Sequence, residues 1–162
     1  MKTETAIFAA GCFWGVQFYF DEVPGVLETE VGYIGGHVDN PSYELVCTHT
    51  TGHAEATKIV YDPAKIGYET LLRHFFRMHD PTQLNRQGPD VGDSYRTAIF
   101  YLNDEQKAEA QKMIDELNKT EFKGKIVTSL EKASTFWPAE DYHQKYSART
   151  GIGMCHIPYA PI

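Results

Sequence analysis

The sequence GCFWG, at residues 11–15, determines how the rest of the chain is interpreted. It follows a short apolar run, residues 6–10, and precedes a stretch with helical spacing of bulky residues, so it predicts a turn from a buried strand into a helix. Backbone N–H groups at a helix start lack partners and favour negative charge, which lowers the pKa of a thiol placed there. We therefore expect Cys12 to be a nucleophile. The alternative is a buried structural cysteine, which is common for this residue type.

The composition fits one globular domain, and we expect residues 1–162 to form it. The net charge is -7 and the basic residues are not clustered, which argues against a nucleic-acid partner. No apolar run is long enough to cross a bilayer and no signal peptide is recognisable, so we expect a cytoplasmic protein without membrane contact. In that compartment Cys12, Cys47 and Cys155 are expected to be reduced, and any disulfide to be transient and catalytic.

Hydrophobic periodicity predicts alternating strands and helices. Strands are expected at 6–11, 26–36, 54–61, 96–102 and 125–130, and helices at 13–23, 68–78 and 140–146, with a further helix capped by Asn103 and running to Leu117. Long polar loops are expected at 37–51 and 80–95, and residues 150–162 are expected to form a mobile tail. This pattern predicts an α+β fold, a two-layer sandwich of a mixed sheet with helices mostly on one face. It does not determine the strand order.

Glu55 is predicted to be a buried acid. In the strand at 54–61 Lys58 should face solvent, and alternation then puts Glu55 on the opposite, inward face. A buried carboxylate is costly unless it is paired, hydrogen-bonded or protonated. Glu55 is therefore a candidate proton donor with a raised pKa; the alternative is a carboxylate that faces water.

Cys155 is predicted to act together with a second sulfur. It lies in a tail rich in glycine and proline, from which a thiol can reach a distant partner. Exposed free cysteines are uncommon because they react. We favour a resolving role over an incidental cysteine.

Other residues carry weaker indications. Tyr33, Tyr43 and Tyr95 could donate hydroxyl hydrogen bonds, although tyrosine more often packs in a half-buried position. Asp90, among glycines, is more typical of a turn.

Two alternative functions involve histidines. Cys47, His49 and His53, completed by His79 or by Cys155 and His156, resemble the ligands of a metal-binding module. This spacing fits no standard zinc site, so we expect no metal and no other cofactor. A cysteine hydrolase that pairs Cys12 with His53 or with His143 is the second alternative, but the papain-like and caspase signatures are absent.

Six blocks of the sequence resemble the A-type peptide methionine sulfoxide reductases, in that family's order. They are GCFWG at 11–15, NPSYELVC at 40–47, TGHAEA at 51–56, NRQGPDVG at 85–92, YRTAIFY at 95–101 and FWPAEDYHQKY at 136–146. The resemblance implies repair of oxidative damage by reduction of methionine S-sulfoxide, free or in proteins, to methionine. It also implies an α/β sandwich with a ferredoxin-like core.

The resemblance further implies a role for each matching residue. Cys12 would attack the sulfoxide sulfur, and Phe13 and Trp14 would form an apolar slot for the S-methyl group. The remaining implied site residues are Glu55, Tyr43 and Tyr95 as hydrogen-bond donors to the sulfoxide oxygen, Asp90 as support for the site, and His143 and Tyr146 as pocket residues.

The resemblance also implies a way to regenerate Cys12. Its sulfenic acid would condense with Cys155, and thioredoxin would reduce the resulting disulfide. The chain departs from many members because Cys155 is its only tail cysteine, and because His49 stands where glycine is usual. Cys47 is expected to be a bystander without activating neighbours, and the protein is expected to be a monomer.

Overall fold

The computed structural model describes residues 2–152 and 159–162. The strands are β1 Glu4–Ala10, β2 Val26–Ile34, β3 Ala54–Tyr61, β4 Arg86–Gln87, β5 Asp90–Val91, β6 Thr97–Tyr101, β7 Ser129–Lys132 and β8 Trp137–Pro138. The α-helices are α1 Phe13–Asp21, α2 Tyr43–Val46, α3 Tyr68–Met78, α4 Asp104–Lys119 and α5 Tyr146–Thr150. Two short 3₁₀ turns, η1 Asp93–Tyr95 and η2 Asp141–His143, complete the described elements.

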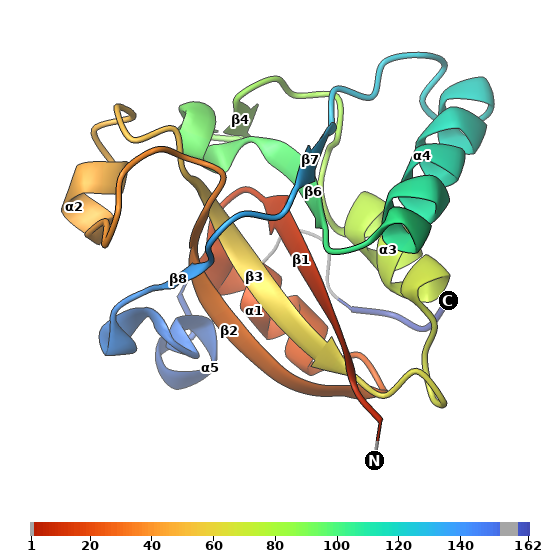
Figure 1. The fold of residues 1–162 in the computed structure, drawn as a ribbon, viewed down its shortest axis with the longest axis horizontal. Helices are drawn as coiled ribbons and strands as arrows, with labels where there is room; N and C mark the ends of the chain where they lie inside the picture. Colours follow the sequence, from red (N-terminus) through yellow and green to blue (C-terminus); the bar gives the residue numbers. More distant parts are fainter. Residues whose placement is uncertain (1, 153–158) are drawn as a thin grey trace.

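Six strands form one mixed sheet in the order β7-β6-β1-β3-β2-β8 (Figure 1). All neighbouring strands are antiparallel except β6 and β7, which are parallel. β4 and β5 form a separate two-stranded ribbon. The mixed sheet and the helices confirm the predicted α+β class.

The helices α1, α3 and α4 pack on one face of the sheet, where they form the larger hydrophobic cluster. Phe8 and Ile99 from the sheet meet Phe20, Leu72 and Phe75 from the helices in this cluster. On the other face Ile34, Phe100 and small alanines are covered by the chain segment between β7 and β8, which crosses in front of the sheet in Figure 1. Both faces are therefore buried, and charged groups on the central strands need a special environment.

Three predicted elements differ in the structure, and tertiary contacts explain each difference. The strand expected at 125–130 begins only at Ser129, because the N–H groups of Ile126 and Val127 donate to Asn118 and Pro81 instead of to the sheet. The helix expected at 140–146 is replaced by η2 and α5. Its backbone is interrupted at Gln144, whose side-chain amide bonds both the N–H and the C=O of Val31.

Leu27 is the third difference. Alternation along the strand predicted at 26–36 puts Leu27 on one face with Thr29, Val31 and Tyr33, but Leu27 is 45% exposed. The pairing of β2 with β3 shifts by one residue between Val26 and Glu28, which leaves Leu27 as a β-bulge.

The predicted helix start at Asn103 is confirmed. The Asn103 side chain accepts a hydrogen bond from the N–H of Gln106 at 2.8 Å, and the Gln106 side chain accepts from the N–H of Leu102. In the part of the chain that the structure describes, no helix has both the length and the apolar character needed to cross a membrane.

Candidate functional site

The site begins at the turn between β1 and α1. Gly11 adopts φ +92, which favours glycine, and a Cβ there would lie 2.8 Å from the Cβ of Gln87. Gly11 therefore lets the second loop approach the turn. Cys12 is the N-cap residue of α1 and is partly exposed, as the sequence predicts for a cysteine between a strand and a helix.

Glu55 lies beside this turn, on the adjacent strand β3. Its side chain is buried, and its Oε1 accepts a hydrogen bond from the backbone N–H of Phe13 at 3.3 Å. Its Oε2 is buried and has no hydrogen-bond partner among the described residues. Burial raises the pKa of Glu55 to about 8, and the charge of Asp90 adds to that rise. The predicted buried acid is therefore protonated at neutral pH.

The predicted low pKa of Cys12 is wrong for the site without substrate. Burial, together with the charges of Glu55 and Asp90, raises the pKa of the Cys12 thiol to about 12, although the N–H groups of Trp14 and Gly15 act in the opposite direction. The helix start thus acts as the sequence suggests, but desolvation outweighs it.

Two hydroxyl groups lie close to this pair. Tyr43 begins α2 and Tyr95 ends η1. Burial raises the pKa of both phenols above the usual range, and Glu55 contributes to both shifts, which places all three groups in one cluster. Both hydroxyls stay protonated at any physiological pH and are available as donors.

Cys47 belongs to this cluster too, and the expectation that it is a bystander stays a prediction. Its thiol accepts hydrogen bonds from the hydroxyls of Tyr43 and Tyr95, which act to lower the thiol pKa. Burial acts more strongly in the opposite direction, and the net pKa of Cys47 is raised. One of these contacts has a signal in the sequence, since Tyr43 and Cys47 are four residues apart in a short helical turn.

Aromatic rings line the next layer of the site. The indole N–H of Trp14 donates to Nδ1 of His143 at 2.9 Å, and the ring of Tyr146 stacks on Trp14 with centroids 3.9 Å apart. Phe13 is completely buried and contacts the ring of His143 at 5.3 Å. The structure therefore brings Trp14, His143 and Tyr146 together, with Phe13 supporting them from within the core.

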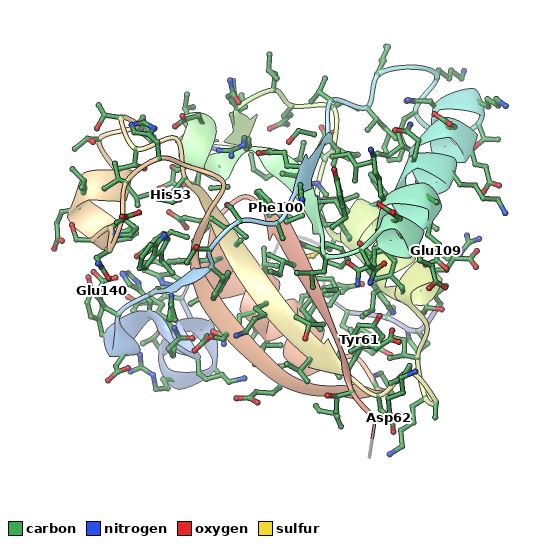
Figure 2. The ribbon with its side chains drawn as sticks, viewed as in Figure 1. His53, Tyr61, Asp62, Phe100, Glu109 and Glu140 are labelled. Carbon is green, nitrogen blue, oxygen red and sulfur yellow. The ribbon has the colours of Figure 1, made fainter. Side chains whose placement is uncertain are left out.

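Glu140 was missed by the sequence analysis. Figure 2 shows it below α2, where its carboxylate accepts from the hydroxyl of Tyr33 at 2.9 Å and from the N–H of Tyr43 at 3.0 Å. These hydrogen bonds lower the pKa of Glu140. Tyr33 is therefore occupied as a donor to Glu140, while Glu140 fixes the start of α2.

The structure also tests the histidine alternatives. Both ring nitrogens of His53 bond the backbone, at Gly36 and Val38, so His53 supports a loop (Figure 2). Nδ1 of His143 accepts from Trp14, and no histidine of the described residues is among the causes of the pKa shift of Cys12. Within residues 2–152 and 159–162, no group of three or more His, Cys, Asp or Glu side chains is placed to hold a metal ion. Cys155 and His156 lie outside the described residues.

Comparison with known proteins identifies the family. The sequence profile described as peptide methionine sulfoxide reductase matches residues 4–162. The chain belongs to this family. The peptide methionine sulfoxide reductase MsrA of Methanoculleus marisnigri is 52% identical over 153 residues, which cover 94% of this chain and 93% of that protein. The MsrA of Pasteurella multocida is 56% identical over 144 residues, which cover 89% of this chain and 82% of that protein.

Solved structures agree with the sequence comparison. Mxr1 from Saccharomyces cerevisiae in reduced form matches with a TM-score of 0.92 and 33% identity, over 99% of this chain and 93% of that chain. Methionine sulfoxide reductase A of Corynebacterium diphtheriae matches with a TM-score of 0.88 and 34% identity, over 99% of this chain and 81% of that chain. The predicted family is confirmed, and the protein is an oxidoreductase that reduces methionine sulfoxide.

Proposed function

We propose that this peptide methionine sulfoxide reductase acts on the S epimer through Cys12, and that Cys155 and thioredoxin regenerate the enzyme. The observation that carries the proposal is the buried carboxyl of Glu55 beside the Cys12 turn, whose Oε2 has no partner among the described residues and whose pKa is raised by burial to about 8. Because Oε1 already accepts the N–H of Phe13, the acid proton belongs on Oε2, where it can be donated to a ligand.

In the first step the Cys12 sulfur attacks the sulfoxide sulfur while the sulfoxide oxygen takes a proton from Glu55. Tyr43 and Tyr95 donate hydrogen bonds to the same oxygen, where negative charge develops in the transition state. The attack forms a bond between the Cys12 sulfur and the substrate sulfur. This bond and the S–O bond of the substrate then break as the oxygen is transferred to Cys12, which becomes a sulfenic acid. Methionine leaves, and the thiol proton returns to the Glu55 carboxylate.

Substrate binding is assigned to the aromatic layer. Trp14, backed by Phe13, receives the S-methyl group, and Tyr146 and His143 fix the orientation of the indole. Asp90 supports the site through its charge, which favours the protonated forms of Glu55 and Cys12.

Regeneration needs a second thiol and an external reductant. The Cys155 thiol condenses with the sulfenic acid of Cys12 to a disulfide with loss of water, and thioredoxin reduces that disulfide by exchange. Support comes from Mxr1, which resembles this chain in its reduced form and has also been solved in complex with Trx2. We propose that the chain works as a single catalytic domain, as a monomer and in the cytoplasm, where thiols are kept reduced.

An epimer-resolved assay with two reductants tests the scheme. Cys12→Ser should abolish reduction of the S epimer with either reductant, because no nucleophile remains. Cys155→Ala should release about one methionine per enzyme with thioredoxin, and should still turn over with dithiothreitol, which reduces the sulfenic acid directly. Activity of Cys12→Ser, or sustained thioredoxin turnover of Cys155→Ala, would contradict the corresponding assignment.

A further inference from the structure

The end of the chain is fixed to the protein at a place remote from the catalytic residues. The ring of Tyr159 lies 5.5 Å from the ring of His74 and 5.9 Å from the ring of Tyr19. The next residue, Ala160, accepts a hydrogen bond through its carbonyl from the guanidinium of Arg77 at 3.2 Å. Residues 159–160 are therefore bound to α1 and α3 through both a side chain and the backbone.

The surface that receives Tyr159 is itself held by a chain of hydrogen bonds. Arg77 donates to the hydroxyl of Tyr19 at 2.8 Å, and that hydroxyl lies 2.7 Å from Nδ1 of His74. Since an arginine only donates, the Tyr19 oxygen accepts from Arg77 and gives its own proton to His74. Burial lowers the pKa of His74 to about 4, so the imidazole is a neutral acceptor at physiological pH. Arg77, Tyr19 and His74 therefore form one hydrogen-bonded network at the surface that receives Tyr159.

The chain is also held just before residue 153. The hydroxyl of Ser147 donates to the carbonyl of Ile152 at 2.8 Å. α5, which carries Ser147, is bound to α1 because Lys145 donates its N–H to Gln17 at 2.7 Å and Tyr146 stacks on Trp14. Figure 1 shows α5 and the C-terminus on opposite sides of α1.

Both attachments therefore connect to α1, whose N-cap residue is Cys12: residues 159–160 directly, and Ile152 through α5. Tyr19 lies about 10 Å from Cys12 along the axis of α1, at about 1.5 Å per residue. An extended chain covers about 3.3–3.6 Å per residue, so three residues span at most about 11 Å and four residues at most about 14 Å. Residues 152 and 159, which flank Cys155 in the sequence, are therefore both attached near α1, while Cys155 itself lies outside the described residues.

We propose that Tyr159 and Arg77 are positioning residues for the regeneration step: they anchor the C-terminus on α1 and α3 and so keep Cys155 within reach of Cys12. This inference rests on the proposed role of Cys155. Tethering raises the effective concentration of one reacting group at the other, and release of one attachment lowers it without changing any contact at the reacting atoms. The anchor therefore affects disulfide formation and leaves sulfoxide reduction unchanged.

A single-turnover experiment on the full chain tests this anchor. One equivalent of a methionine S-sulfoxide peptide is added to reduced enzyme, and the rates of methionine formation and of Cys12–Cys155 disulfide formation are measured separately. Tyr159→Ala should form the disulfide about tenfold more slowly at an unchanged rate of methionine formation. Tyr159→Phe, which keeps the ring, should restore the wild-type rate. Ile162→Ala, a change at an exposed residue of the same segment, is the matched control and should have no effect.

Each outcome decides between the anchor and its alternatives. Arg77→Gln should also slow disulfide formation selectively, and turnover with dithiothreitol should stay at the wild-type level in all these variants. A wild-type disulfide rate in Tyr159→Ala, or an equal loss in both steps together with a lower melting temperature, would overturn the anchor while leaving the Cys155 scheme intact. Absence of a Cys12–Cys155 disulfide in the wild-type enzyme, with thioredoxin turnover retained in Cys155→Ala, would overturn both.

Discussion

At the scale of single residues, burial is the main reason that both Glu55 and Cys12 stay protonated at neutral pH. Each is desolvated, and the negative charge of Glu55 contributes to the raised pKa of Cys12. Because the thiol is neutral before substrate binds, the sulfoxide oxygen must receive its proton as the sulfur is attacked. A carboxyl with a pKa of about 8 is close enough to neutral pH to give that proton and to recover it.

Substitutions at Glu55 separate the donor role from the role of negative charge. Glu55→Gln keeps a hydrogen-bond donor and should retain kcat/KM within about tenfold, whereas Glu55→Ala removes it and should lose about a hundredfold. Wild-type activity should also fall as the pH rises through about 8, where Glu55 ionises, and Glu55→Gln should lack this fall. Steady-state kinetics between pH 6 and 9 checks both predictions. Equal losses of kcat/KM in Glu55→Gln and Glu55→Ala would refute the donor role of Glu55.

The sequence predicts the burial of Glu55 but not the state of Cys12, for a physical reason. Side-chain alternation in a strand is local, so the inward face of β3 can be identified from Lys58 alone. A thiol pKa is the balance of helix N–H groups, desolvation and neighbouring charges, and Glu55 and Asp90 reach Cys12 only through the fold. The same holds for one partner of Cys47, since Tyr95 reaches it from the second loop, whereas Tyr43 lies in the same helical turn.

At the scale of elements, α2 depends on contacts outside itself. It has only 4 residues, far too few to be stable alone, and its start is capped by Ser42 and bound by Glu140. This turn was not predicted in the loop at 37–51, because a helix this short leaves no readable period. By contrast α3 was predicted correctly, since its 11 residues present a full apolar stripe to the sheet.

Removal of the Glu140 carboxylate should therefore loosen α2 and misplace Tyr43. Glu140→Ala leaves the hydroxyl of Tyr33 and the N–H of Tyr43 without partners, which should cost about 1–3 kcal/mol of stability and lower kcat/KM severalfold. Tyr33→Phe is the matched control, because it removes one of the two hydrogen bonds and leaves the N–H of Tyr43 bound. Urea unfolding and kinetics measure the two effects, and a larger loss of activity in Tyr33→Phe than in Glu140→Ala would contradict this role of Glu140.

At the scale of the whole molecule, buried titratable groups set opposing trends in stability. Burial lowers the pKa of His74 and His79 from 6.5 to about 4. Between these two pH values the unfolded chain binds more protons than the folded one, so stability falls as the pH drops from 6.5 to about 4. The lowered pKa values of Asp80 and Glu140 add to the loss at acid pH. Glu55 changes stability with pH in the opposite direction. Its pKa rises from 4.5 to about 8, so the folded state binds more protons and stability falls as the pH rises across that window.

The free energy of unfolding should therefore be greatest at roughly pH 6 to 7. In this range the two buried histidines no longer reduce stability, and the loss of stability caused by ionisation of Glu55 is still incomplete. Glu55→Gln removes the ionisable group and should stabilise the protein at pH 8 to 9, with a gain that shrinks to about zero below pH 4.5, the pKa of an unperturbed glutamate. Glu28→Gln, at an exposed position of β2, is the matched control and should shift stability little at either pH. Denaturant unfolding across this pH range gives the measurement. A Glu55→Gln difference that is independent of pH would show that this carboxyl has an ordinary pKa, and the acid role assigned to it at the site would then have to be abandoned.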